Sequence, residues 1–162
     1  PAALPEGEGT PASPQGGGLE GVEGWKIYRN DKHGFEFRYP ETLPAKYIST
    51  QTWPPAVETQ PGVFSCQESK ISEPGKPRTR KIIGIPSFCV TSVSDGTAGS
   101  VYNNYSYTTF FSGKLITFNF TLRFPNCSAF DEQRMAECRE SHTTFDPDSI
   151  VKKIYSTFRF VK

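Results

Sequence analysis

The chain has 162 residues, with 18 Lys and Arg against 17 Asp and Glu; this length suits one domain, and the balance does not demand nucleic acid. No run of about 18 apolar residues is present, so the sequence predicts no membrane-spanning helix. The charge is uneven, because the first 24 residues carry four acids and no base, which leaves 18 bases and 13 acids, a net +5, on residues 25–162. A mildly basic domain favours acidic partners.

The first 24 residues differ in composition from the rest of the chain. They contain no aromatic residue, and they hold seven of the 14 Gly and four of the 14 Pro. Such a segment cannot bury enough apolar surface to offset the entropy of ordering it. We therefore expect residues 1–24 to form a disordered tether and residues 25–162 to form a single globular domain. Because the chain begins with Pro, we also expect that a signal peptide or anchor was removed upstream, with an artificial truncation as the alternative.

The first half of the domain is predicted to be mainly strand and loop. Residues 25–30 and 35–39 are expected to form a hairpin, because Phe35, Phe37 and Tyr39 alternate with polar residues after a turn-forming segment. Shorter strands are expected at 46–49 and 63–66, followed by a polar loop at 67–79. Two further short strands are expected at 81–86 and 87–91, around a Gly/Pro break, and a small-residue loop at 95–100.

The second half contains the clearest hairpin, with strands at 101–111 and 114–124, and two helices follow it. Apolar residues alternate strictly with polar ones from 116 to 124. A short helix is expected at 132–141, and a last helix begins after Asp146 as N-cap, with Pro147 in the first helical position. Phe158 and Phe160 then alternate in a terminal strand. These elements predict an α+β fold, a central antiparallel sheet with packed helices, in which the terminal strand pairs near the first hairpin.

The four Cys are Cys66, Cys89, Cys127 and Cys138, and no two form a C-x-x-C pair. An even count with long spacing favours structural disulfides formed in an oxidising compartment over free thiols in the cytosol. Cys66 and Cys89 end neighbouring predicted strands, and Cys127 and Cys138 flank the turn and short helix after the long strand. We therefore predict the disulfides Cys66–Cys89 and Cys127–Cys138.

A metal site is the alternative use of one Cys pair. Cys138 and His142 are four residues apart, so they could present two ligands on one helical face, and Cys127 with Asp131 could complete a zinc site. Zinc sites with two Cys usually use a tight C-x₂₋₄-C pair, which this chain lacks. The disulfide is therefore favoured, and we expect no metal and no cofactor.

Two sets of motifs resemble known proteins. The segments GFEFRYP (34–40) and DPDSIVKKIYSTFRF (146–160) resemble the two ends of PsbP/Mog1-type domains, which implies an α/β/α sandwich. The segments FCVT (88–91), GTAGSVYNNYSY (96–107) and TFNFTLRFPNC (117–127), with Glu137 and Cys138, are similar to uncharacterised exported or membrane-anchored proteins of patescibacterial bacteria. This second resemblance implies an extracytoplasmic protein and brings no known activity.

Signals for catalysis are weak. His33 and His142 are the only His, and a Ser-His-Asp arrangement could be drawn from Ser94, Asp95 and either one, but no G-x-S-x-G elbow supports it. The loop at 96–100 lacks the Lys and the spacing of a phosphate-binding loop. The alternative function is an extracytoplasmic hydrolase or metal-dependent enzyme that uses His142 or His33 with nearby acids.

A possible partner surface combines a basic segment with a Tyr-rich strand; its residues are Lys76, Arg78, Arg80, Lys81, Tyr102, Tyr105 and Tyr107. The bases attract anions, and exposed Tyr can stack on sugars or proteins; the alternatives are a solvated loop tip for the basic segment and coverage of the Tyr-rich strand by a helix. We therefore expect a non-catalytic binding or scaffolding module of the bacterial cell envelope, at the cell surface or in a periplasm-like space. It would bind an envelope protein or an anionic glycan and no specific nucleic acid, and it would meet the membrane only through the removed N-terminal anchor.

Overall fold

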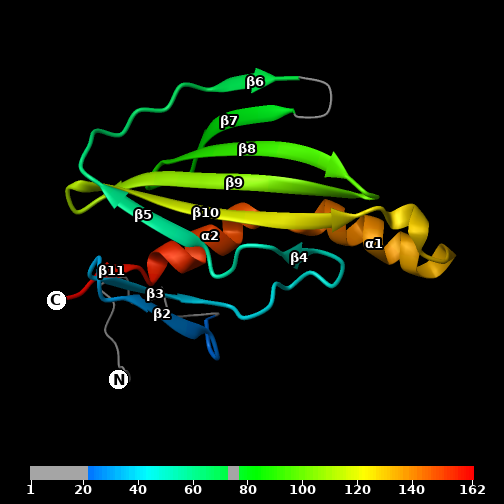
Figure 1. Ribbon diagram of the computed structural model, residues 1–162, viewed down its shortest axis with the longest axis horizontal. Coiled ribbons are helices and arrows are strands. Elements are labelled where there is room, and N and C mark those ends of the chain that lie inside the picture. The colour runs from blue at the N-terminus through cyan, green and yellow to red at the C-terminus, as the bar shows by residue number, and fades with distance from the viewer. Residues whose placement is uncertain (1–21, 73–76) are drawn as a thin grey trace. The chain divides into compact units, whose positions relative to one another are not determined.

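The computed structural model describes residues 22–72 and 77–162, which divide into two compact units (Figure 1). The first unit joins residues 22–42 to Asp146–Lys162, and the second unit is Leu43–Phe145. Most of the predicted tether lies outside the described residues. The described chain begins at Val22, whose side chain is 1% exposed, three residues before the domain boundary that composition predicts. The single-domain organisation of residues 25–162 stays a prediction.

The first unit is a three-stranded antiparallel sheet with one helix. The strand order is β11-β3-β2, where β2 is Lys26–Asn30, β3 is Phe35–Tyr39 and β11 is Arg159–Phe160. Helix α2 (Pro147–Ser156) begins as predicted, with Pro147 at its start and the Asp146 carboxylate accepting a hydrogen bond from the Asp148 N–H. Because β11 pairs with β3, the predicted placement of the terminal strand beside the first hairpin is confirmed.

Contacts between the two ends of the chain hold this small sheet together. Glu36 on β3 forms an ion pair with Arg159, with 2.7 Å between Nη2 and Oε2. The rings of Phe35 and Phe158 are stacked, with centroids 5.4 Å apart, and they are 1% and 5% exposed. Apolar burial thus supplies the main stabilisation of the pairing, and the ion pair favours its register.

The second unit is built on a larger antiparallel sheet. Its strands follow the order β4-β10-β9-β8-β7-β6, and β5 also pairs with β10. In chain order they are β4 (Ser49–Thr50), β5 (Ala56–Gln60), β6 (Ser69–Ile71), β7 (Arg78–Ile83), β8 (Phe88–Thr97), β9 (Ser100–Phe111) and β10 (Lys114–Pro125). A 3₁₀ helix, η2 (Cys127–Ala129), and helix α1 (Glu132–Thr144) follow β10. The α+β class is therefore present, but the strands of residues 22–72 and 77–162 form two sheets and not one central sheet.

Several predicted segments differ from the structure, and strand pairing explains three of the differences. Residues 63–66 form no strand, whereas β5 forms in the Pro- and Thr-rich segment before them because β10 provides its hydrogen-bonding partner. Strand β6 forms within the predicted loop because it pairs with β7. The predicted loop at 95–100 is mostly strand, since β8 continues through Thr97 and only Ala98 and Gly99 make the turn, at φ 46° and 77°.

The central strands have one apolar face and one polar face. On β10, Ile116, Phe118 and Leu122 are each fully buried, and the register places Phe118 opposite Tyr107 of β9. The intervening residues of β10 point to the other face, because successive strand residues alternate. There the polar side chains of Thr117, Asn119 and Thr121 lie opposite Thr108, Ser106 and Asn104 of β9. These six side chains are partly or fully exposed to solvent.

Both predicted disulfides are present, so all four Cys are paired. Cys66–Cys89 joins the segment before β6 to β8, and Cys127–Cys138 joins η2 to α1, with Cα–Cα distances of 5.5 and 5.6 Å. Two disulfides indicate an oxidising, extracytoplasmic environment. Among the described residues, no helix has the length and apolar character needed to cross a bilayer.

Candidate functional site

The polar face of the large sheet carries rows of hydroxyl and amide groups linked between β9 and β10. The Ser106 hydroxyl donates to Asn119 Oδ1 at 2.6 Å, and the Thr121 hydroxyl donates to Asn104 Oδ1 at 2.6 Å. Thr108 and Thr117 share a hydroxyl–hydroxyl hydrogen bond of 2.9 Å. Cross-strand pairs of this kind restrict side-chain rotation, so the groups are held in place before any ligand arrives.

Two basic side chains lie on the same polar face, farther along the sheet on β7. Arg80 of β7 lies opposite Thr91 of β8, and Thr91 lies opposite Ser106 of β9. In the next row Arg78 lies opposite Val93, and Val93 lies opposite Asn104. Arg78 and Arg80 are exposed, and Arg80 Nε donates to Thr91 Oγ1 at 3.3 Å. Because opposed residues in an antiparallel pair share a face, both guanidinium groups belong to the same surface as the hydroxyl and amide rows.

The predicted partner surface is divided by the sheet. Tyr102 lies opposite Arg123 and Asp95, on the polar face. Lys81 lies opposite Val90, and Val90 lies opposite Tyr107, so Lys81 and Tyr107 belong to the apolar face. Tyr107 is fully buried, and Tyr105 stacks on Phe120 with ring centroids 5.2 Å apart. Tyr105, Tyr107 and Lys81 are therefore not part of one surface with the arginines.

Of the seven residues predicted for that surface, Arg78, Arg80 and Tyr102 share one face, and Lys76 lies outside the described residues. The hydroxyl and amide rows were missed as a site. Their only sequence signal was the polar half of the alternating pattern in the strand at 114–124, which by itself indicates an exposed face and nothing more specific.

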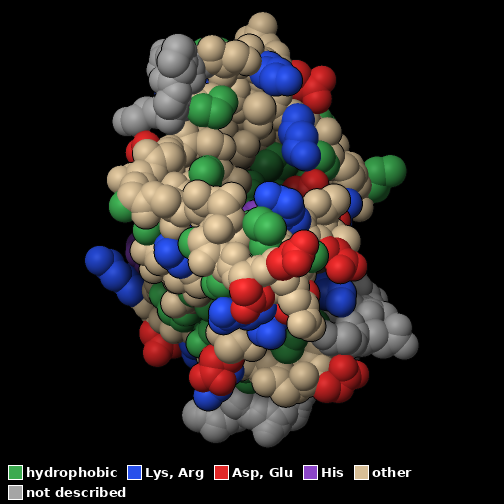
Figure 2. All heavy atoms as spheres, turned by 90° about the vertical axis from the view of Figure 1, so that its right-hand side faces the viewer, with side chains coloured by type: hydrophobic (Ala, Val, Ile, Leu, Met, Phe, Trp, Pro, Cys, Tyr) green, Lys and Arg blue, Asp and Glu red, His purple; other side chains and the backbone are tan. Residues whose placement is uncertain are grey.

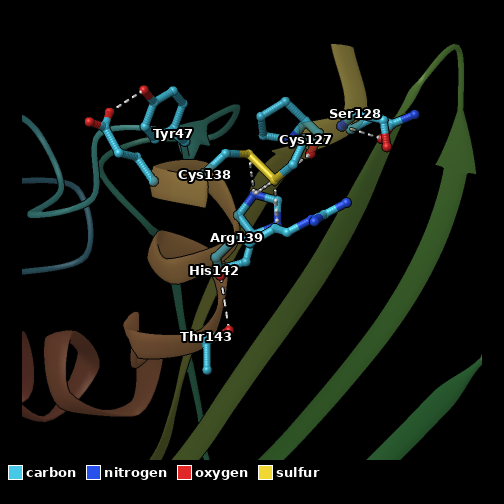
Figure 3. The surroundings of a disulfide bond; sticks show 10 residues. Tyr47, Cys127, Ser128, Cys138, Arg139, His142 and Thr143 are labelled. Atoms are coloured by element: carbon cyan, nitrogen blue, oxygen red, sulfur yellow. Dashed lines mark hydrogen bonds between the residues drawn. A yellow bond between two sulfur atoms is a disulfide. The ribbon is translucent and has the colours of Figure 1, made fainter. Parts of the chain in front are cut away.

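A second cluster surrounds the Cys127–Cys138 disulfide. Cys138 and His142 lie one turn apart on α1, and Cys127 comes from η2 (Figure 3). His142 Nε2 is 3.7 Å from Cys138 Sγ and 3.9 Å from Cys127 Sγ, and His142 Nδ1 is 3.7 Å from Cys127 Sγ. Cys138 is fully buried and Cys127 is 8% exposed. The imidazole therefore lies against both sulfurs.

Asp131, the fourth ligand considered for a zinc site, is used elsewhere. It caps α1 by accepting a hydrogen bond from the Arg134 N–H at 2.9 Å, and its other oxygen pairs with Arg134 Nε at 2.9 Å. These hydrogen bonds from Arg134 lower the pKa of the Asp131 carboxyl. In the part of the chain that the structure describes, the group of possible metal ligands consists of Cys127, Cys138 and His142, without Asp131.

His142 also borders a pocket of about 490 Å³ at the end of the sheet. The other lining residues are Gly96, Thr97, Ala98, Gly99, Ser100, Val101, Phe124, Pro125 and Asn126. The β8–β9 turn lies at the right-hand end of the sheet in Figure 1, and Figure 2, which faces that end, shows a hollow with hydrophobic side chains on its floor. The hydroxyl of Ser100 is buried there without a hydrogen-bond partner.

The pocket offers little for acid–base chemistry. Burial lowers the pKa of His142, so its imidazole is neutral near pH 7, and the ring meets Phe124 edge-on with centroids 5.3 Å apart. Among the described residues that line the pocket, none carries a carboxylate that could orient or charge the imidazole. A neutral His without an acid is a weak arrangement for hydrolysis.

The other catalytic combination from the sequence does not assemble. Ser94 and Asp95 follow one another on β8, so their side chains point to opposite faces of the sheet. The Ser94 hydroxyl donates to Asn103 Oδ1 at 2.7 Å. His33 lies in the turn between β2 and β3, where its backbone N–H donates to Asn30 Oδ1 at 2.9 Å.

No protein-family model, curated protein or solved structure matches this chain significantly. The function is therefore argued from the geometry of these two places, because a fold class alone does not define an activity.

Proposed function

We propose that this chain is an extracytoplasmic, non-catalytic binding module that holds an anionic glycan on the polar face of its large sheet. The observation that carries the proposal is the continuity of the hydroxyl and amide rows with Arg78 and Arg80. Sugar hydroxyl groups need donors and acceptors at fixed places, and acidic groups on a glycan suit the forked guanidinium of Arg.

The hydrogen bonds within the rows leave donors for a ligand. In both amide pairs the oxygen of Asn104 or Asn119 is the acceptor, so the two N–H groups of each amide are not used in these bonds. Tyr102 adds an aromatic side chain on the same face, and aromatic rings stack on sugar rings. The net charge of +5 on residues 25–162 favours an acidic ligand over a neutral one.

Several finer features belong to the same proposal. The two disulfides support a location at the cell surface or in a periplasm-like space of a bacterial envelope, with the module tethered at its N-terminus. Kinship with exported patescibacterial proteins and a PsbP/Mog1-like sandwich rests on the sequence motifs. A scaffolding role with an envelope protein as partner is the competing form of the proposal.

The test is binding to an immobilised acidic polysaccharide, polygalacturonate, with neutral dextran as the comparison. The double variant Arg78→Glu/Arg80→Glu should weaken retention by more than about 10-fold, since each charge-assisted hydrogen bond contributes about 1.5–3 kcal/mol. The matched control is Lys152→Glu/Lys153→Glu, which makes the same change in net charge at two exposed positions of α2.

A third variant separates recognition from simple charge attraction. Asn104→Ala/Asn119→Ala leaves the net charge unchanged, and it should still weaken binding to polygalacturonate because the amide donors are gone. Equal losses in the Arg pair and the Lys control would mean that only net charge matters and would refute the site. Absence of polysaccharide binding, together with stoichiometric recovery of one protein from an envelope extract, would establish the protein-partner form instead.

A further inference from the structure

Three metal-ligating side chains meet beside the pocket. The sulfurs of Cys127 and Cys138 and a ring nitrogen of His142 all lie within 4.8 Å of one another. Two of these residues are fixed on one face of α1, and the third is fixed by η2, so the protein backbone brings the group together. Within the described parts of the chain, the other disulfide, Cys66–Cys89, belongs to no group of this kind, and the contact of Cys66 Sγ is with the Lys81 carbonyl oxygen at 3.8 Å.

The distances to the imidazole already suit a tetrahedral metal centre. With metal–sulfur bonds of about 2.3 Å and metal–nitrogen bonds of about 2.0–2.1 Å, tetrahedral ligands lie about 3.6 Å apart for sulfur and nitrogen and about 3.8 Å apart for two sulfurs. His142 Nε2 lies 3.7 and 3.9 Å from the two sulfurs. Two changes complete the site. The separation between the two sulfurs must increase, which breaking their bond allows, and the imidazole must turn so that Nε2 points between them, because Cys127 Sγ now lies as close to Nδ1 as to Nε2.

We propose that reduction of Cys127–Cys138 converts this place into a site for one zinc-type cation, bound by the two thiolates and His142 Nε2. The disulfide form and the metal form exclude each other, because each uses both sulfurs. The proposal is independent of glycan binding on the polar face.

The chemistry balances with a dithiol as the reductant. The dithiol gives two electrons and two protons to the disulfide and becomes a disulfide itself, while Cys127 and Cys138 become thiols. A divalent cation then displaces the two thiol protons, so binding releases two protons and leaves a site in which two thiolates neutralise the cation. Neutrality matters here, since Cys138 is fully buried and an isolated thiolate there would be poorly solvated.

Three protein ligands leave one position of a tetrahedral cation open. Of the three residues, only His142 borders the pocket of about 490 Å³, so water or a small ligand would approach the cation from the side of the imidazole. Metal centres with two Cys, one His and an open fourth position are a known arrangement for zinc. The site is therefore expected to bind the cation with a water molecule in the fourth position.

The experiment titrates Co²⁺ into the full chain in its oxidised and phosphine-reduced forms. Tetrahedral Co²⁺ bound to thiolates gives visible absorption and a near-ultraviolet charge-transfer band, and added Zn²⁺ should displace it. We expect one equivalent to bind to the reduced form and none to the oxidised form. The variant His142→Phe, which keeps an aromatic ring against Phe124, should weaken Co²⁺ binding by more than about 10-fold, since even loss of an outer partner of a metal ligand has that effect.

Two controls keep the outcome decisive if reduction loosens the fold. Cys66→Ser/Cys89→Ser should leave Co²⁺ binding unchanged after reduction, and His33→Gln should do the same. In a reduced chain that has unfolded, Zn²⁺ should restore the near-ultraviolet circular dichroism only when His142 is present, because metal binding then drives folding. No binding by the reduced chain, binding that does not depend on His142, or binding that requires Cys66 and Cys89 would each overturn the proposal.

Discussion

The two disulfides should contribute differently to the stability of the second unit, and loop length and burial predict opposite orders. In the chain-entropy account, the 11-residue separation of Cys127–Cys138 gives about 2.8 kcal/mol and the 23-residue separation of Cys66–Cys89 about 3.4 kcal/mol. Loop length alone therefore predicts that the Cys66–Cys89 bond stabilises the unit more.

Burial reverses this order. Cys127 is 8% exposed and Cys138 is fully buried, whereas Cys66 and Cys89 are both only partly buried. Removing a buried sulfur loses about 1 kcal/mol of apolar burial and packing, roughly that of a methylene group. The variant Cys127→Ala/Cys138→Ala should thus lose about 5 kcal/mol and Cys66→Ala/Cys89→Ala about 3–4 kcal/mol of unfolding free energy.

Urea denaturation without reductant measures both variants on one scale, because both disulfides lie in the same compact unit. The signal should come from the near-ultraviolet circular dichroism, since Tyr105 and Tyr107 of that unit pack against other rings. A larger loss in Cys66→Ala/Cys89→Ala would refute the argument that burial decides the order. The denaturant slope should rise in both variants, because an unfolded chain with one cross-link fewer exposes more surface, so each free energy is extrapolated with the slope of its own variant.

Further predictions concern the terminal strand β11, the N-cap of α1 and the titration of His142. A chain that stops after Thr157 lacks Phe158 and β11, so the amide protons of β3 should lose their protection from hydrogen exchange; retained protection would contradict the placement of β11. Asp131→Ala should lower the midpoint of urea unfolding, while Asp131→Asn, which can still cap α1, should lower it less. Burial holds the pKa of His142 below its ordinary 6.5, so on acidification the unfolded chain takes up the proton before the folded chain does. The unfolding free energy should therefore be highest above pH 6.5 and should decrease as the pH falls through the folded-state pKa. His142→Gln should remove that part of the pH dependence, and an unchanged urea midpoint profile would show that His142 is not its source.

The elements that the sequence predicted correctly are those defined by local rules. Strict alternation at 114–124 requires a strand with one buried face, and the small-residue turn at Ser112 and Gly113, both with positive φ, joins it to its partner. Asp146 and Pro147 define the start of α2 in the same way, through the first unsatisfied N–H groups of the helix. The disulfide pairs were also predictable, because each joins segments that the predicted elements bring close.

Tertiary structure alone decided the other features. Strands β5 and β6 have little strand pattern of their own, and they form because β10 and β7 offer them backbone hydrogen bonds. The register of β9 with β10 decides which set of its alternating side chains is buried. Tyr105 and Tyr107 therefore lie on the apolar face, and Tyr102 lies on the polar face. The meeting of His142 with both sulfurs likewise depends on η2 and α1 folding back on each other. Local sequence specifies strand periodicity and helix ends. The pairing of distant segments depends on packing between them, and a short segment carries no information about a partner that is distant in the sequence.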